Sequence, residues 1–247
     1  MSARSTEQSQ AGDGSRATSF DGFSPATFGW FDGLAADNSR SYFTAHRETY
    51  DRWVRGSLEE MLEGLADELG GRVRMFRQNR DVRFSADKSP YKTTTYGLIL
   101  ERPESLAPLY AQLSAGGLFA GSGYHVLAAD QLARYRSAVD AEVSGSELGR
   151  AVAEAEAAGV TVFGSALKNA PRGYSREHPR IGLLRHRSLF AGRRIERGAK
   201  GITRGAALAH TRAAWTACGP LNTWLDAQVG ASEMPVEPRH GRGRRAS

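Results

Sequence analysis

The sequence predicts an α+β fold in which an antiparallel sheet, or a mixed one, packs against N-terminal and C-terminal helices. Three observations favour this class. Residues 24–71 carry apolar side chains at helical spacing, residues 72–127 alternate polar with apolar and are interrupted by glycines, and helical spacing returns after residue 129. Helices, then strands, then helices again are typical of α+β proteins rather than of alternating βαβ units.

Three helices are expected before the sheet. Ser24 suits the N-cap of the first, and Pro25 suits its first turn. A second helix is expected over residues 39–56, with Asn38 or Ser39 as its cap. Ser57 is expected to cap a third helix, which ends at the glycine pair 70–71. The aromatic residues of this helical opening are interpreted as part of the core.

The strand candidates are rich in residues that favour extended backbone. They cover residues 72–78, 81–85, 93–101, 106–114, 117–127 and 159–167, with one more after a short helix within 178–195. Glycines between successive candidates indicate an antiparallel meander. The remaining helices are expected at 129–142, 145–157 and 204–230, the last one bent or broken at Gly219-Pro220.

Length and composition fit a cytoplasmic globular protein. The 247 residues are 40% hydrophobic and 24% charged, and they allow one α+β domain at 21–231 between disordered tails at 1–20 and 232–247. The sequence contains no apolar run long enough to span a membrane, and its first residues lack the apolar stretch of a secretory signal. A single cysteine excludes an intramolecular disulfide.

Positive charge is concentrated in two segments. The formal net charge is +6, yet residues 72–100 alone carry a net +5 and residues 168–200 a net +8, whereas the segments around them are acidic. The basic end "RHGRGRRAS" adds to the total but has the composition of a flexible tail. The clustering predicts that the folded protein attracts a negatively charged partner.

The first basic segment, "NRDVRFSADKSPYK" at residues 79–92, is the best candidate for a site. A rigid turn around Pro90 would present its side chains at the sheet edge. The candidate ligand-binding residues are Arg80, Arg83, Lys88, Tyr91 and Lys92. Asp81, Asp87 and Lys88 are the candidate catalytic residues, with one aspartate as a base. Alternatively, these charges form a structural salt-bridge network.

The second basic segment, "LKNAPRGYSREHPR" at residues 167–180, is interpreted as a second wall of the same anionic pocket. Lys168 and Arg172 would be its ligand donors. The alternative is a solvated loop in which Tyr174 and His178 cap the following helix. The two interpretations are left open at this point.

These strings resemble a widespread bacterial and fungal family of conserved hypothetical proteins, a domain of unknown function. The similarity is carried by "FSPATFGWFDGLAADNSRSYFTAHRETY", "RDVRFSADKSPYK" and "LKNAPRGYSREHP", in this order, and covers roughly residues 20–195. The chain departs from it at 41–43, where "SYF" stands in place of a tryptophan before the Phe, and in a longer helical C-terminus. The resemblance implies no particular activity.

Motifs for metals, nucleotide cofactors and nucleophilic catalysis are not found. The six histidines lack metal-site spacing, "GGLFAGSG" lacks the context of a dinucleotide fingerprint, and no GxSxG elbow exists. Cys218 lies among apolar helix residues and is expected to be inert.

Three classes of function remain. In the first, residues 79–92 and 167–180 form a basic pocket that binds a phosphorylated or carboxylated small molecule, with or without acting on it as an enzyme. In the second, the basic segments bind nucleic acid, with Tyr91 or Tyr96 available for base stacking. In the third, the charges are structural and the protein is a non-catalytic interaction module. The sequence leaves the oligomeric state open.

Overall fold

The computed structural model describes residues 20–83 and 85–234. The helices are α1 (Pro25–Ala36), α2 (Arg40–Ala45), α3 (Arg47–Thr49), the π-helical η1 (Tyr50–Gly56), α4 (Ser57–Leu69), α5 (Ala129–Asp140), α6 (Glu142–Ala157), α7 (Ile181–Leu184), α8 (Arg204–Ala217) and α9 (Gly219–Gln228). The strands are β1 (Gly22–Phe23), β2 (Arg72–Met75), β3 (Thr94–Leu100), β4 (Leu109–Ser114), β5 (Gly117–Tyr124), β6 (Thr161–Phe163), β7 (Leu189–Glu196) and β8 (Ile202–Thr203).

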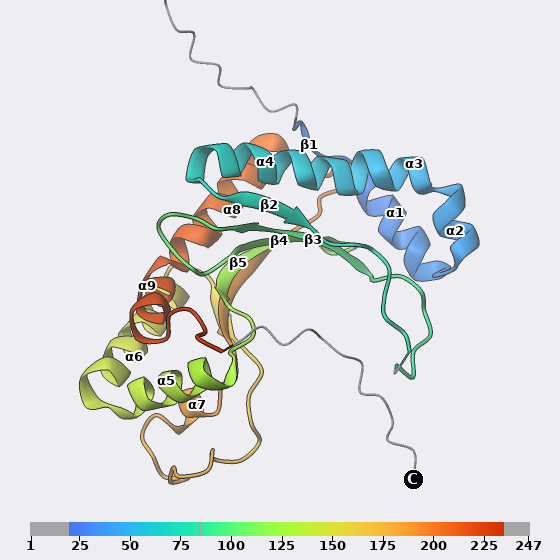
Figure 1. Ribbon diagram of the computed structural model, residues 1–247. Coiled ribbons are helices and arrows are strands. Elements are labelled where there is room, and N and C mark those ends of the chain that lie inside the picture. Colours follow the sequence, from blue (N-terminus) through green and yellow to red (C-terminus); the bar gives the residue numbers. More distant parts are fainter. Residues whose placement is uncertain (1–19, 84, 235–247) are drawn as a thin grey trace, which may run out of the picture.

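The main sheet confirms the predicted α+β class (Figure 1). Its strand order is β2-β3-β4-β5-β7-β6, and every pairing in it is antiparallel. The first four strands are the predicted meander, because each pairs with the next one along the chain. β6 lies outside β7 at the far edge, and β1 pairs with β8 in a separate two-stranded sheet.

The helical opening follows the prediction at its start and departs from it later. α1 begins after Ser24 with a proline in its first turn, and Ser39 accepts a hydrogen bond from the backbone N–H of Tyr42 at the start of α2. The single helix expected at 39–56 is wrong, since it is interrupted at His46 and continues as η1. Ser57 is not a cap: the backbone before it is already helical, and its hydroxyl donates to the carbonyl of Arg52.

The strand expected at 81–85 is also wrong, because the described residues of that stretch are not in a strand. The segment between β2 and β3 is held together at its base by the bridge between Asn79 and Tyr91 and by the hydrogen bond from Arg80 N to Pro90 O, at 2.8 Å. Beyond this base the chain leaves the sheet and finds no neighbouring strand to pair with. Local preference for extended backbone is therefore not sufficient here.

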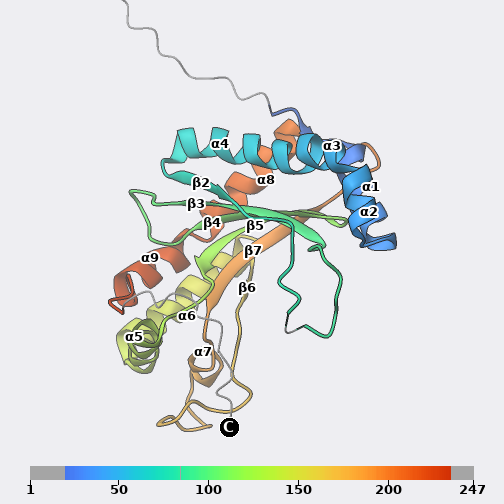
Figure 2. The ribbon, with the colours of Figure 1, turned by 45° about the vertical axis from the view of Figure 1, so that its right-hand side comes forward.

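Helices cover one face of the main sheet. α4 contacts β2, β3 and β4, while α8 contacts β5 and β7, and α9 contacts β5. Alternate residues of the strands, such as Ile99 in β3 and Leu113 in β4, point into this layer and are fully buried. Figure 2 shows α4 and α8 on this side, whereas the segments 76–93 and 164–188 extend from the sheet in the other direction.

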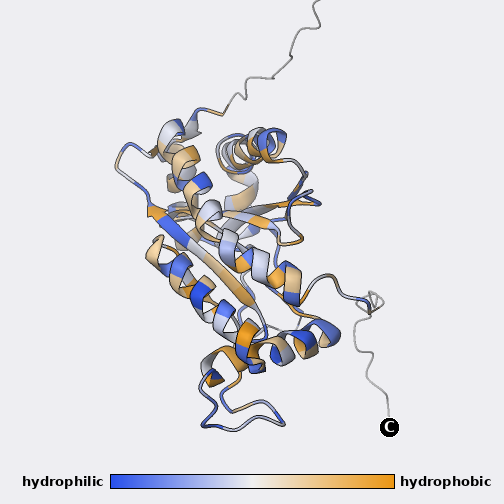
Figure 3. Ribbon diagram, turned by 90° about the vertical axis from the view of Figure 1, so that its left-hand side faces the viewer, coloured by the Kyte–Doolittle hydropathy of each residue, from blue (hydrophilic) through white to orange (hydrophobic). Residues whose placement is uncertain are grey.

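The C-terminal helices form a second helical group with α5 and α6. α9 packs against α6 and α5, and α8 ends next to α9 at the predicted break before Pro220. The helices carry both hydrophobic and hydrophilic residues (Figure 3). α5 ends at Asp140 and α6 starts at Glu142, so the predicted gap at 143–144 is instead a one-residue break at Ala141.

Candidate functional site

The two arginines of the first basic segment are neutralised within that segment. Arg83 donates two hydrogen bonds to the carboxylate of Asp81, at 2.9 and 2.6 Å, and Arg80 forms an ion pair with Asp87. Hydrogen bonding to Arg83 lowers the pKa of Asp81 to about 2, and Arg80 lowers the pKa of Asp87. Both carboxylates are therefore ionised and weakly basic, which makes them poor general bases at neutral pH.

The two lysines of the segment differ from the arginines. Lys88 Nζ donates to the carbonyl of Val82 at 3.1 Å, and Lys92 Nζ donates to the carbonyl of Arg77. Neither lysine forms an ion pair with a residue in the described ranges. The Lys92 ammonium lies 4.9 Å from the ring centroid of Tyr96. Burial, followed by the charge of Arg77, lowers the pKa of Lys92. Lys92 is thus a cation beside another cation, next to an aromatic ring.

Tyr91 anchors the segment instead of projecting from it. Its side chain is 7% exposed and stacks on Phe43, with ring centroids 4.3 Å apart. Its backbone N–H and carbonyl both bind the side chain of Asn38, each at 3.1 Å. Gln78, also buried, accepts from Thr95 and Tyr50 and donates to the carbonyl of Lys92. Contacts with the helical opening therefore fix the position of Lys92, two residues before β3.

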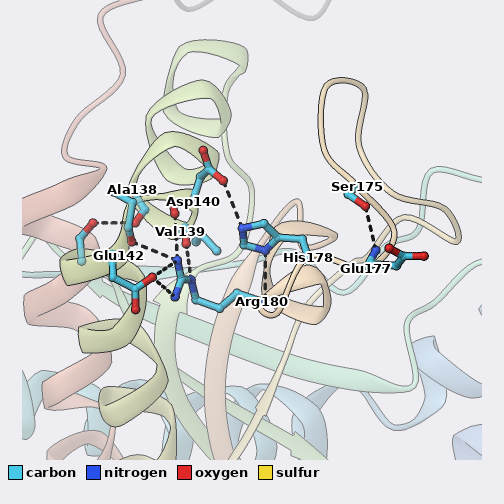
Figure 4. Close-up of polar contacts among 10 residues, drawn as sticks. Ala138, Val139, Asp140, Glu142, Ser175, Glu177, His178 and Arg180 are labelled. Carbon is cyan, nitrogen blue, oxygen red and sulfur yellow. Dashed lines mark hydrogen bonds and ion pairs between the residues drawn. The ribbon is translucent and has the colours of Figure 1, made fainter.

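The second basic segment is anchored to the junction of α5 and α6 (Figure 4). Arg180 donates to the carbonyls of Val139 and Asp140, at 2.7 and 2.9 Å, and forms an ion pair with Glu142. Its guanidinium thereby satisfies carbonyls that the end of α5 leaves without intrahelical partners. His178 Nδ1 accepts from the backbone N–H of Arg180, and its Nε2 lies 3.1 Å from Asp140.

The structure gives no support to one pocket shared by the two basic segments. Residues 76–93 lead into the first residue of β3, Thr94. Through the pairing of β3 with β4, β4 with β5 and β5 with β7, Thr94 lies at the same end of the sheet as Glu196, the last residue of β7. Residues 164–188 instead enter β7 at its beginning. The segments thus leave opposite ends of the sheet and appear as two separate arms in Figure 1.

Lys168 and Arg172, the expected donors of the second segment, are exposed. No hydrogen bond or ion pair joins the two segments within residues 20–83 and 85–234. The physical reason is the strand pairing: β6 lies at one edge of the sheet and β2 at the other. To predict whether the two segments lie close together, one must know the strand order, and sequence patterns do not give it.

Between the two arms lies a sheet face that helices leave open. On β3 and β4 the residues of this face are half-buried, whereas their neighbours toward α4 are fully buried. In the described ranges, no helix lies over β3 and β4 on this side (Figure 2). We call this surface the open face; its residues include Arg74, Phe76, Tyr96, Leu98, Tyr110, Gln112, Ser114, Phe119, Phe163, Phe190 and Arg194.

Six aromatic side chains cross the open face from one edge strand to the other. This aromatic row consists of Phe76, Tyr96, Tyr110, Phe119, Phe190 and Phe163. Phe76 stacks on Tyr96 with centroids 4.7 Å apart, and each later ring lies 5.3–6.3 Å from the next. Phe163 at the far edge is 40% exposed. The row is continuous because opposite positions of neighbouring strands share a face.

Glycines allow the rings of the aromatic row to lie close to the backbone. Gly121 and Gly192 are register partners in β5 and β7. The ring of Phe119 occupies the space that a side chain at Gly192 would fill, and the ring of Phe190 does so at Gly121. The open face is therefore low and flat at its centre, a shape on which another planar group can lie.

Cations without carboxylate partners accompany the aromatic row. The guanidinium of Arg74 lies 5.1 Å from the Phe76 centroid, and Arg194 donates to Ser114 Oγ at 2.7 Å. With Lys92, these side chains form no ion pair with any residue that the structure describes. Glu196, at the end of β7, is the carboxylate nearest to Arg194 along the strand and is exposed. The open face thus combines π surfaces with unpaired positive charge.

Sequence patterns named Tyr96 but missed the rest of the aromatic row. The signal was present as alternation: in β3 and β4 every second residue is large or polar while its neighbours are small or aliphatic. Alternation shows that the two faces of a strand differ in composition. Only the strand order reveals that the other five aromatic residues of the row lie on the same face as Tyr96.

The described residues form neither a metal-binding cluster nor a membrane-spanning helix. Residues 20–83 and 85–234 contain no group of three or more histidine, cysteine, aspartate or glutamate side chains placed to hold a metal ion. Every helix in these ranges is too short or too polar to cross a membrane.

Comparison with known proteins identifies a family but no activity. The family model described as conserved hypothetical protein, DUF2461, matches residues 26–224, which is most of the chain. The matched range includes the aromatic row and both basic segments. No curated protein matches the chain.

Proposed function

The chain belongs to the DUF2461 family of conserved hypothetical proteins, whose description states no activity. From the surface of the protein, we propose that it binds single-stranded nucleic acid across the open face. The observation that carries this proposal is the aromatic row, six rings in mutual contact beside cations that lack carboxylate partners. Single strands are bound by this combination, bases on aromatic rings and phosphates on cations.

Base stacking is supported by the arrangement of the rings. Sheet surfaces that carry two or three aromatic side chains are a common platform for unstacked bases. Here Tyr96 and Tyr110 are half-buried at the centre of β3 and β4, so each is held rigidly while part of the ring faces solvent. Rings that are fixed in the free protein lose little conformational entropy when a base stacks on them.

Phosphate binding is supported by the position of Lys92. Its ammonium is close to the positive charge of Arg77, and both this charge and burial lower the pKa of Lys92. A bound phosphate would offset both effects, because it would bring a negative charge to a partly desolvated cation. Arg74 on the edge strand β2 and Arg194 on β7, next to the opposite edge, would extend the contacts to more than one phosphate.

The width of the sheet favours a short chain of nucleotides over a single one. Six strands at the usual separation extend over about 24 Å. Single-stranded sites on comparably small β-structures hold roughly 4–16 nucleotides. A single nucleotide or another small anion could occupy only one part of the row, next to one of the three cations.

The test is a fluorescence anisotropy titration with labelled oligouridylate and oligothymidylate at two salt concentrations. For single strands, the logarithm of the affinity falls with the logarithm of the salt concentration, with a slope of about 0.7 for each phosphate neutralised. If Arg74, Lys92 and Arg194 each neutralise one phosphate, a fourfold rise in salt concentration should therefore weaken binding about 20-fold. Absence of binding to both oligonucleotides at low salt would contradict the proposal. Equal binding at both salt concentrations would contradict the role of the cations.

A pair of variants tests the location of the site. Tyr96→Ala should weaken binding by about 1–3 kcal/mol, the usual loss for one stacking residue. The matched control is Trp53→Ala on η1, because Trp53 is 38% exposed and lies 4.7 Å below Arg52, an arrangement similar to that of Tyr96 below Lys92. Thermal melting checks that both variants fold. Equal losses in both variants would place the site elsewhere.

A further inference from the structure

A cavity of about 420 Å³ lies away from the open face, between the end of α4, the β3–β4 connection and helices α8 and α9. Its volume is in the range of small-molecule sites. The apolar part of its lining includes Leu69, Leu109 and Trp215. The polar part includes one closed ion pair, in which Arg212 donates both to Glu68 Oε1 at 3.1 Å and to Oε2 at 2.6 Å.

Arg102, in the lining of this cavity, is a buried cation with little compensation. Its side chain is 10% exposed, and within the described residues its guanidinium donates no hydrogen bond. Its ion-pair partner is Glu104, 3.6 Å away, whose side chain is 79% exposed. Buried guanidinium groups are ordinarily hydrogen-bonded, because leaving their donors unsatisfied is costly. The buried Nε of Arg102 therefore has no acceptor among the described residues.

The same cavity contains acceptors that lack a cation. The two oxygens of Asp226 accept hydrogen bonds from the hydroxyls of Tyr124 and Ser105, at 2.7 and 2.6 Å, but no lysine or arginine pairs with Asp226 in the described ranges. Asn222, which is 5% exposed, donates to Ser122, and its Oδ1 has no donor among the described residues. In the described residues, Arg102 thus has only a distant ion-pair partner, Asp226 has no cationic partner, and Asn222 Oδ1 has no donor.

We propose that this cavity binds a small zwitterion, such as a free α-amino acid, with its carboxylate on Arg102 and its ammonium on Asp226. A carboxylate would supply the acceptors that the planar guanidinium lacks. An ammonium would pair with Asp226 and lie near the Asn222 amide. The apolar surface of Trp215 and Leu109 would receive an apolar side chain of the ligand.

The experiment is saturation-transfer NMR on the full chain with each common α-amino acid, with acetate and methylammonium as probes of one charge each. At least one amino acid should bind with a dissociation constant of about 1 mM or lower. It should bind at least tenfold more tightly than either single-charge probe. If no amino acid gives a signal at about 10 mM, or if acetate binds as tightly as every amino acid, the proposal is overturned.

Variants separate a ligand site from a structural role. Arg102→Gln should weaken binding about tenfold or more, and Asp226→Asn should do the same. Arg102→Met should melt no lower than the parent protein without ligand, because an apolar chain replaces a largely buried charge whose one ion pair is long and reaches an exposed carboxylate. It should also lose the ligand signal. Glu63→Gln, an exposed position of α4 outside the cavity lining, is the control and should change the affinity less than threefold. Unchanged binding in Arg102→Gln and Arg102→Met would contradict the site.

Discussion

The thiol of Cys218 illustrates how burial controls chemistry at a single residue. Cys218 is fully buried, and its Sγ lies 3.2 Å from the carbonyl of Ala191 and 3.1 Å from that of Ala214. Burial raises its pKa to about 11, so it remains a neutral thiol at neutral pH. We expect the folded protein to resist iodoacetamide at pH 8, whereas the urea-unfolded protein should react at once.

Intact mass measurement before and after unfolding checks this, and rapid labelling of the folded protein would contradict it. The pKa also predicts a pH dependence. The pKa of the Cys218 thiol in the folded protein lies above the ordinary value of 9.0, so the folded state favours the neutral thiol. The resulting contribution to the free energy of unfolding is complete below pH 9 and is lost as the pH rises through about 11.

At the residue scale, the motif "RDVRFSADKSPYK" identifies polar residues but not their partners. Asp81 and Arg83 pair with each other across two positions, and Arg80 reaches Asp87 across seven. The first spacing is one that a strand would also give, but the second follows from neither helix nor strand geometry, since the segment is irregular. Lys92 was predicted as a ligand-binding residue, and it stays one in the proposal, but its place beside Tyr96 depends on where β3 begins.

At the element scale, local patterns predict most of the helices and the meander. Strands that alternate polar with apolar residues and are separated by glycines tend to pair with the next strand along the chain. The order of β2 to β5 could therefore be predicted from the sequence. The positions of β6 and β7 do not, because their pairing joins residues far apart in the chain. For the same reason the expected pocket between residues 79–92 and 167–180 could not be tested by any local pattern.

Gly192→Ala tests the packing of the aromatic row on β5 and β7. A Cβ at position 192 would lie 2.6 Å from the carbonyl oxygen of Ala120 and would displace the ring of Phe119. We expect a loss of about 1–3 kcal/mol in the free energy of unfolding and weaker oligonucleotide binding. Gly149→Ala, in the middle of α6 with open space around it, is the control and should stabilise by up to about 1 kcal/mol.

Urea unfolding followed by circular dichroism measures both variants. If Gly192→Ala were as stable as the parent and bound oligonucleotides equally well, the close packing of Phe119 against β7 would not matter for the open face.

Arg180→Ala tests the anchor of the second basic segment. The change removes donors to the carbonyls at the end of α5 and the ion pair with Glu142 (Figure 4). Because the Arg180 side chain is only 15% exposed, we expect a loss of about 2–3 kcal/mol. Arg72→Ala breaks an ion pair whose side chains are 61% and 66% exposed, and it should cost about 1 kcal/mol or less.

Hydrogen exchange gives the more specific result for Arg180→Ala: faster exchange confined to the α5–α6 junction and residues 164–188. Exchange that increases equally throughout the sheet would show that Arg180 supports the whole fold and not this segment.

At the scale of the whole molecule, the two faces of the sheet have different compositions for different reasons. One face is buried under α4, α8 and α9, and most of its residues are small or aliphatic. The open face retains aromatic rings and unpaired cations that contribute less to folding, because they remain partly exposed to water. The net charge of +6 would draw a polyanion toward this surface. The zwitterion cavity, on the covered side, is independent of it.

The most direct test of the central claim is photo-crosslinking to an oligonucleotide that contains 4-thiouridine, with the crosslinked peptides identified by mass spectrometry. The account predicts crosslinks on β3, β4, β5 and β7 at Tyr96, Tyr110, Phe119 and Phe190, lost in excess unlabelled oligonucleotide. Crosslinks confined to the helical face around Trp53, or none above the level of a protein without affinity for nucleic acid, would contradict it.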